Sequence, residues 1–292
     1  MKIFFLSLLL YSSFLPATCD FEKGKSWSVK IPSDVFKSGF FSMFGVVLGA
    51  LELYDQGNIA SLSLEFGDKG FYYNPKRGEN WWTYYFEPMN LSVRSPVLIN
   101  LPIDQSIRTR FFDISLKSGP EKNYELIQKY IKIKPYLLKK VDAFQKEFFK
   151  GRFVVGIHYR ATDKFIGEAP EMSPEGFVKQ IIEETAMFKD PYFYVATDRA
   201  CFIDEMVKAF PNRVFFIDAE RSINGEPIHT NAKSPDLQGE EALVDCLLLS
   251  KTDFLIRTSS NLSLASTWFN PDLPVVLVNP GYHDTKQIVG IK

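Results

Sequence analysis

The pattern of hydrophobic and polar positions divides the chain near residue 150. Beyond it, short apolar and β-branched runs alternate with longer segments of helical periodicity. Strands are expected at 153–159, 192–196, 214–217, 254–257 and 275–278, and helices at 174–189, from 198 to about 210, at 240–250 and at 262–268. Strand–helix alternation with short links predicts a mostly parallel, doubly wound α/β sheet.

The first half has a weaker pattern. A glycine-flanked turn at 38–45 is expected to lead into a helix over 46–54, followed by an alternating strand over 60–66. Residues 123–149 read as helical, with a break at Pro135. The glycines either let the backbone approach a ligand closely or only form the turn. We place a domain boundary near residue 150.

The segment 72–88 is dense in aromatic and turn residues. Aromatic side chains supply large apolar surfaces that pack in cores, and their faces also stack on sugars. This segment is therefore either ordinary packing beside the first domain or a platform for a sugar.

Polar side chains follow several expected strands. They are His158 and Arg160, Thr197 and Asp198, Asp218, and Thr258, Ser259 and Ser260. The carboxyl ends of parallel strands meet along one edge of a sheet, where open α/β proteins bind their ligands. The sequence therefore predicts a nucleotide-like crevice at this edge.

Arg160 and the serines are candidates for holding an anion there. Arg160 offers a planar fork of donors suited to a phosphate, or it forms a surface ion pair with Asp163 worth less than about 1 kcal/mol. Ser259 and Ser260 lie at a helix N-terminus, whose N–H groups favour an anion, or Ser260 acts only as the helix cap.

Three other polar residues have two readings each. Asp198 accepts hydrogen bonds from a ribose or base, or caps the following helix. His158 faces the ligand or is a core histidine. Asp245 lies inside an apolar helix and needs a partner, so it anchors the site structurally or receives donors of the ligand.

Composition excludes several classes of protein. The formal net charge of −1 over 292 residues gives no support to a nucleic-acid binder. Phosphate-loop and GxGxxG patterns are absent, which argues against an ATPase or a dehydrogenase. The three cysteines form no disulfide framework, and Cys246 reads as an inert core thiol. The three histidines are far apart in sequence, so no structural metal is expected.

The N-terminal segment reads as a secretory signal at 1–19. Lys2 precedes an apolar run from Ile3 to Leu15, and small residues come before Asp20. The run is shorter than the ~20 residues that span a bilayer, so membrane attachment is expected only if the segment stays uncleaved. We expect the secretory pathway: the ER or Golgi lumen in a eukaryote, export or the periplasm in a bacterium.

The stretch from His158 to Lys164 resembles the HxRxxDK motif of the α1,6-fucosyltransferases, both the core N-glycan and the nodulation enzymes. Protein O-fucosyltransferases are more distant relatives. The likeness continues through 196–198 and through 245–260. It is good over 151–262 and loose over 38–90.

The resemblance implies a GT-B-like fold of two Rossmann-like domains, an acceptor-side domain at 20–150 and a nucleotide-sugar-binding domain at 151–292. It also implies inverting transfer from GDP-fucose to a glycan or protein-linked acceptor, with no metal or other cofactor. By this likeness, Arg160 holds the β-phosphate, Lys164 lies near the donor and Glu168 is the general base. Other matches to the nucleotide site are Asp198, Asp245 and Ser260, and His229 lies in the 218–239 loop that faces the donor.

Two points limit this reading. From the residues alone, Glu168 is an ordinary loop acid. Ala161 also stands where the family often has a second arginine, which removes one phosphate contact. Two alternatives therefore remain open: a non-catalytic nucleotide- or glycan-binding protein on the same fold, and a transferase that uses another nucleotide sugar.

Overall fold

A computed structural model describes residues 27–32, 38–161, 170–224, 226 and 234–281. The strands are β1 (Trp27–Pro32), β2 (Ser61–Glu65), β3 (Ile99–Leu101), β4 (Val154–Tyr159), β5 (Tyr192–Thr197), β6 (Val214–Phe215), β7 (Phe254–Arg257) and β8 (Val275–Leu277). The α-helices are α1 (Phe40–Asp55), α2 (Trp82–Tyr85), α3 (Gln105–Tyr130), α4 (Pro135–Phe144), α5 (Pro174–Thr185), α6 (Ala200–Ala209), α7 (Pro235–Leu249) and α8 (Asn261–Phe269). In this part of the chain, no helix is long and apolar enough to cross a membrane.

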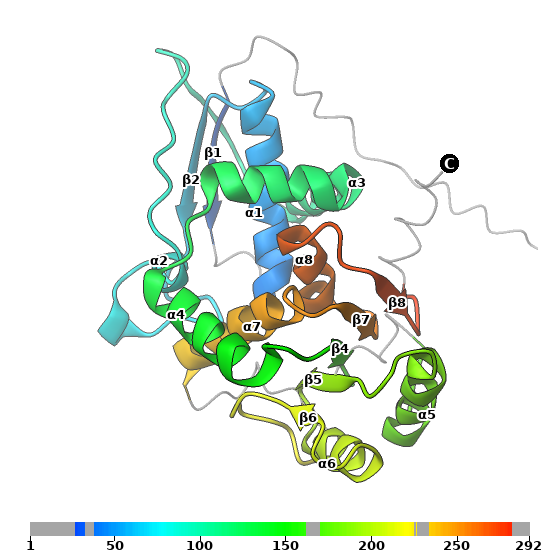
Figure 1. The fold of residues 1–292 in the computed structure, drawn as a ribbon. Helices are drawn as coiled ribbons and strands as arrows, with labels where there is room; N and C mark the ends of the chain where they lie inside the picture. Colours follow the sequence, from blue (N-terminus) through cyan, green and yellow to red (C-terminus); the bar gives the residue numbers. More distant parts are fainter. Residues whose placement is uncertain (1–26, 33–37, 162–169, 225, 227–233, 282–292) are drawn as a thin grey trace, which may run out of the picture.

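The second half forms a parallel five-stranded sheet in the order β6-β5-β4-β7-β8. Helices α5 and α6 cover one face, and α7 and α8 cover the other (Figure 1). Side chains alternate along β4: Val155 and Ile157 pack with the α5 and α6 residues, and Val154 packs on the opposite face. The predicted doubly wound α/β sheet is confirmed.

The first half holds a smaller parallel sheet, in the order β2-β1-β3. A parallel β1–α1–β2 unit forms its centre, and β2 lies where the alternating pattern predicted a strand. The hydrophobic pattern did not predict strands β1 and β3. Strand β3 has three residues and lies at the edge of the sheet, where Ile99 and Asn100 are exposed.

Helix α1 corrects the predicted turn at 38–45. The helix already begins at Phe40, with Gly39 as its N-cap. Phe40, Phe41 and Phe44 are all buried, together with most of the rest of the helix. A helix that is covered on nearly every side lacks a polar face, so it shows no amphipathic period to read.

The glycines of α1 serve helix packing. A Cβ atom on Gly49 would lie 1.8 Å from the carbonyl oxygen of Phe111, and one on Gly45 would lie 2.6 Å from the Phe112 ring. The backbones of α1 and α3 therefore approach each other closely. Helix α3 is itself kinked at Gly119, which has a φ of 78° and precedes Pro120.

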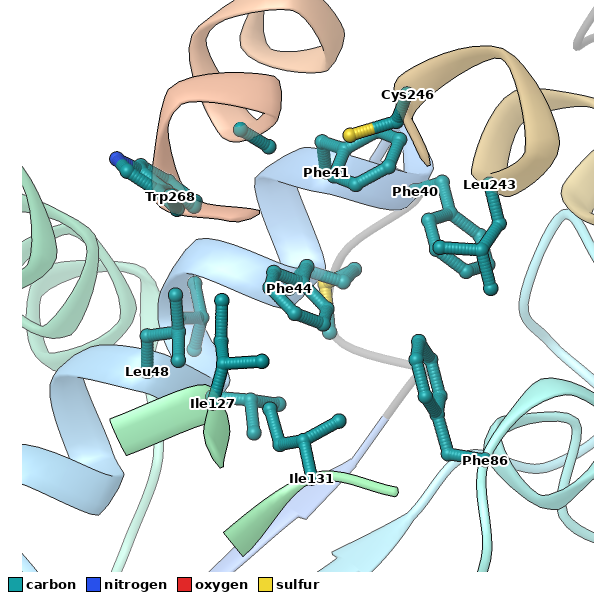
Figure 2. Packing of buried hydrophobic residues seen from close by; sticks show 14 of the residues in the cluster. Phe40, Phe41, Phe44, Leu48, Phe86, Ile127, Ile131, Leu243, Cys246 and Trp268 are labelled. Atoms are coloured by element: carbon teal, nitrogen blue, oxygen red, sulfur yellow. The ribbon is translucent and has the colours of Figure 1, made fainter. Parts of the chain in front are cut away.

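One hydrophobic cluster joins the two halves (Figure 2). Phe44 of α1 stacks with Trp82 at a ring-centroid distance of 5.9 Å and with Trp268 of α8 at 6.4 Å. Leu243 and Cys246 of α7 belong to the same cluster. The cysteine is fully buried and free, as the sequence predicted for a core thiol.

The aromatic segment at 72–88 is packing, and the sugar-platform alternative is wrong. Trp81, Tyr85 and Phe86 are at most 2 % exposed. Trp81 stacks on Phe66 at 4.6 Å, and the backbone N–H of Phe40 donates to the hydroxyl of Tyr72 at 2.7 Å. Aromatic faces that lie inside a core cannot stack on a sugar.

Polar contacts fasten this segment to the start of α7. The carboxylate of Asp236 accepts hydrogen bonds from Asn74 Nδ2 at 2.8 Å and from Arg77 Nη1 at 3.2 Å. The hydroxyl of Tyr85 donates to the carbonyl oxygen of Asp236 at 2.8 Å. A Cβ atom on Gly239 would lie 2.3 Å from that hydroxyl, so α7 lies directly against Tyr85. The two halves are thus joined by a shared core and by a polar rim.

Candidate functional site

Arg160 and Asp198 form an ion pair at the carboxyl edge of the five-stranded sheet. Arg160 directly follows β4, and its Nε donates to Asp198 Oδ2 at 3.1 Å. The other carboxylate oxygen of Asp198 accepts the backbone N–H of Ala161 at 3.2 Å. The Asp198 side chain is 7 % exposed and that of Arg160 is 26 % exposed. Asp198 therefore holds the guanidinium while leaving part of it open to solvent.

Of the two readings of Asp198, the structure contradicts the helix cap, and the contact with a ribose or base stays a prediction. The N-cap of α6 is Arg199, and no side chain caps it. Asp198 orients Arg160 and does not act as the cap. Asp163, the other partner considered for Arg160, lies outside the described residues.

Strands β4 and β7 are tied together at the same edge. The backbone N–H of Arg160 donates to Thr258 Oγ1 at 2.9 Å, and the N–H of Thr258 donates to the carbonyl of His158 at 3.0 Å. The parallel register pairs His158 with Arg257 and with Ala196. The predicted strand-end residues at 158, 160, 198 and 258 thus come together in one place.

His158 is a buried, neutral histidine. Its residue exposure is 3 %, and burial followed by the positive charges of Arg160 and Arg257 lowers its pKa from 6.5 to about 3. Within the described part of the chain, its Nδ1 atom has no hydrogen-bond partner. A buried imidazole nitrogen without a partner is costly, so the reading as a satisfied core histidine fits poorly.

The loop between β7 and α8 is held from below. Ser260 caps α8, since its Oγ accepts the N–H of Leu262 at 3.3 Å. The N–H of Ser259 donates to Asn279 Oδ1 at 2.9 Å, and Asn279 Nδ2 donates to the carbonyl of Pro170 at 3.0 Å. Asn279 therefore connects the start of α8 with the end of the β4–α5 loop.

Asn279 was missed in the sequence, although a signal was there. It follows the last strand in the same way that the other polar residues follow theirs. Asn279 is buried, and both the oxygen and the nitrogen of its side-chain amide make hydrogen bonds. Arg257, the last residue of β7, was also not assigned, because an arginine inside a strand reads as part of the strand.

Asp245 has the partner that its sequence context demanded. Oδ1 accepts the hydroxyl of Tyr194 at 2.5 Å, below the sheet edge on the α7 face. Burial raises the pKa of Asp245 from 3.8 to about 7, against the opposing effects of the Tyr194 hydrogen bond and the charge of Arg221. The rings of Phe144 and Phe149 pack against Tyr194. Asp245 thus anchors α7 on β5, and its contact with a ligand stays a prediction.

Lys164, Glu168 and His229 lie outside the described residues. Their roles therefore stay predictions. In the described ranges, no group of three or more His, Cys, Asp or Glu side chains is placed to hold a metal ion.

Fold and edge together define the class: a two-sheet α/β protein with a shared core and an arginine-centred polar cluster at the carboxyl edge of its second sheet. No protein-family model matches the chain. Solved structures match over most of its length. The fucosyltransferase NodZ from Bradyrhizobium superposes with a TM-score of 0.60 at 16 % identity, covering 89 % of this chain and 99 % of that one.

NodZ, an α1,6-fucosyltransferase, has also been solved with GDP and after soaking with GDP-fucose. A mutant of Arabidopsis thaliana FUT1 in complex with GDP matches with a TM-score of 0.54 at 12 % identity, covering 91 % of this chain and 73 % of that one. POFUT1 in complex with GDP matches with a TM-score of 0.50 at 11 % identity, covering 86 % and 98 %. The chain therefore has the GT-B-like fold of the fucosyltransferases, as the motif resemblance predicted.

Proposed function

We propose that this protein is a metal-independent, inverting glycosyltransferase that transfers fucose from GDP-fucose to a glycan or protein-linked acceptor. The observation that carries the proposal is the oriented, partly exposed guanidinium of Arg160 beside the neutral His158, at the carboxyl edge of a fucosyltransferase fold. That edge is where open α/β sheets bind nucleotides.

The chemistry needs positive charge at this position. The acceptor hydroxyl oxygen forms a bond to the anomeric carbon, the bond from that carbon to the β-phosphate oxygen breaks, and GDP leaves with the electron pair. Fixed cations stabilise the negative charge that grows on the leaving diphosphate. Arg160 provides one, oriented by Asp198. Besides the Nε that bonds Asp198, the guanidinium carries Nη1 and Nη2, which also bear N–H groups.

Lys164 and Glu168 complete the proposal by their match to the family motif. Lys164 adds a second positive charge near the donor, and Glu168 takes the proton of the acceptor hydroxyl as general base. His229 and Ser260 contact the donor in the same scheme, with Ser259 beside them at the start of α8. Inversion and metal independence rest on the resemblance alone.

Location in the secretory pathway belongs to the same proposal. The apolar run from Ile3 to Leu15 supports it. Nucleotide sugars are present in the ER and Golgi lumen, which suits a eukaryotic enzyme of this kind.

The residue at position 161 supports a second candidate function. Ala161 replaces the second arginine that the family often carries. A protein with a weaker diphosphate contact fits a non-catalytic nucleotide- or glycan-binding role, or a different nucleotide sugar.

A donor panel tests these functions. The chain from Asp20 onward is incubated with GDP-, UDP- and CMP-sugars, and release of the nucleotide is measured. We expect turnover of GDP-fucose and, by calorimetry, a loss of about 10- to 100-fold in GDP affinity for Arg160→Ala, since one charged hydrogen bond contributes about 1.5–3 kcal/mol.

Arg152 supplies the matched control at the opposite end of β4. Its guanidinium donates to the carbonyls of Glu147 and Phe148 and lies over the Tyr192 ring, away from the site. Arg152→Ala should lower stability slightly and leave nucleotide binding unchanged. Binding of GDP without turnover would favour a non-catalytic binding protein. Turnover of another nucleotide sugar would identify a different donor. Absence of binding to GDP, UDP and CMP would contradict the transferase proposal.

A further inference from the structure

A cavity of about 390 Å³ lies at the amino edge of the five-stranded sheet, opposite the proposed donor edge. Its walls come from the end of α4, the π-helical turn Gln145–Phe149 and the loops that enter β4 and β7. Helices α4 and α7, which precede the two strands, lie side by side (Figure 1). Four cationic side chains and two carboxylates line the cavity, although the whole chain has a formal net charge of −1. Positive charge is therefore concentrated here.

The two loops of this edge are fixed to each other. Strands β4 and β7 are neighbours, and the backbone N–H of Asp253 donates to the carbonyl of Val154 at 2.8 Å. In return, Asp253 Oδ2 accepts the backbone N–H of Val154 at 2.8 Å. Asp253 therefore uses one carboxylate oxygen inside the protein, and it holds the loop that carries Lys251 beside the start of β4.

The π-helical turn places two more lysines at the same cavity. The backbone N–H of Lys150 donates to the carbonyl of Gln145 at 3.1 Å, and Gly151, with a φ of 75°, then turns the chain toward β4. Lys146 and Lys150 both line the cavity. Turns of this kind are rare and frequently lie at functional sites. Lysines from two separate loops thus converge on one place.

The three lysines of the cavity have no counter-ion in the described part of the chain. Neither Lys146, Lys150 nor Lys251 forms an ion pair there. Lys140, earlier on the same helix, is by contrast paired with Glu240. Like charges that are gathered around one cavity repel each other, and a bound anion relieves that repulsion.

Arg152 is the fourth cation of the cavity, but its guanidinium is already engaged. Nη1 donates to the carbonyls of Glu147 and Phe148, and the group lies 5.0 Å from the centre of the Tyr192 ring. A lysine ammonium acts as a compact charge with three donors, which suits the oxygens of a phosphoryl group. We therefore assign the ligand to the lysines.

We propose that Lys146, Lys150 and Lys251 form a second anion site, which binds a phosphoryl group, supplied either by a free phosphate or by the headgroup of a lipid. This site is independent of the proposed nucleotide function. It lies at the opposite ends of the strands that carry Arg160 and Thr258, so a molecule held there leaves the donor edge open.

Calorimetry with inorganic phosphate at low ionic strength tests the site. The chain from Asp20 onward carries Arg160→Ala in every sample, so that the donor edge does not contribute. Lys146→Gln, Lys150→Gln and Lys251→Gln together should lower phosphate affinity by about tenfold or more, because three charges act on one anion. The three side chains are exposed, and thermal unfolding establishes that the variant is folded.

The matched control removes the same charge from the other side of the sheet. Lys179→Gln, Lys189→Gln and Lys208→Gln change three exposed lysines on or next to α5 and α6. This variant should bind phosphate as the parent does. Equal losses of affinity in the two variants would reveal a general effect of net charge and would overturn the site.

Vesicles distinguish the two sources of the phosphoryl group. Flotation compares phosphatidylglycerol vesicles with phosphatidylcholine vesicles. Binding to phosphatidylglycerol that is lost in the variant of Lys146, Lys150 and Lys251 assigns the site to a lipid headgroup. Binding of phosphate without vesicle binding assigns it to a soluble phosphate. If neither binds, or if binding does not depend on these lysines, the proposal is wrong, while GDP binding at Arg160 is unaffected by that outcome.

Discussion

The aromatic segment of the first half and the polar edge of the second half both looked like ligand sites in the sequence, yet they are built in opposite ways. In the aromatic segment, the hydroxyls of Tyr72 and Tyr85 are used up inside the protein, and the rings are buried. At the edge, Arg160 is partly open to solvent and His158 Nδ1 has no partner among the described residues.

The difference separates packing from binding. A buried polar group that is satisfied by the protein stabilises the fold, whereas an oriented charge or an unsatisfied nitrogen keeps capacity for a ligand. Residue type does not distinguish the two regions, because both carry side chains able to hold a sugar nucleotide.

The largest effect should come from the first half. Gly49→Val forces a side chain into the backbone of Phe111 and should lower the free energy of unfolding by about 3 kcal/mol or more. Gly39→Ala is the control, since nothing lies within 4 Å of a Cβ there and its φ of −60° suits any residue. Denaturant unfolding measures both variants. A tolerated Gly49→Val would mean that α1 and α3 are not in close contact.

Asp245 tests whether a residue of the second half is structural. Because its folded pKa of about 7 lies above the unfolded value of 3.8, the folded state holds a proton that the unfolded state releases, and stability falls as pH rises from about 4 to about 7. Asp245→Asn should remove this loss and gain on the order of 2 kcal/mol at pH 8 relative to pH 5.

Thermal unfolding at the two pH values measures the Asp245 effect. His158 titrates in the opposite sense, losing stability as pH falls from 6.5 toward 3, and it contributes equally to both proteins. Calorimetry with GDP on the same variant is the second readout. A loss of GDP affinity would place Asp245 in the binding edge as well as in the packing.

Asn279 should show a smaller effect confined to the edge. Asn279→Asp keeps an acceptor for the Ser259 N–H but loses the N–H group that donates to the Pro170 carbonyl. Since one such hydrogen bond contributes about 1 kcal/mol, we expect the KM for the nucleotide sugar to rise about three- to tenfold. Asn270→Asp is matched chemistry at the far end of α8, where Nδ2 donates to the Ser250 carbonyl at 2.9 Å. Equal changes of KM in the two variants would contradict a positioning role for Asn279.

The smallest effect is expected at the rim between the halves. Tyr85→Phe removes the hydroxyl that donates to the Asp236 carbonyl and should cost about 1 kcal/mol of unfolding free energy with nucleotide affinity unchanged. Denaturant unfolding and GDP calorimetry together measure it. A marked loss of GDP affinity would show that this rim, too, shapes the site.

Much of the second half could be predicted from its sequence. Strand β7 lies where the apolar run predicted it, and the other strands differ by one or two residues at their ends. Helix α7 differs more: it begins at Pro235 instead of 240, because its first turn is polar and is stabilised by Asn74 and Arg77 of the first half. A stabilising contact from another part of the chain leaves no local pattern.

The sequence by itself determined the class of the fold and the position of Arg160, since parallel strands bring their carboxyl ends to one edge. Only the tertiary structure decided what each residue at that edge contacts. Asp198 reaches Arg160 from the neighbouring strand, Asn279 joins two loops far apart in sequence, and Arg257 lies opposite His158. The periodicity of side chains follows from local backbone geometry and can be read along the chain, whereas pairing across strands depends on register and packing between distant segments.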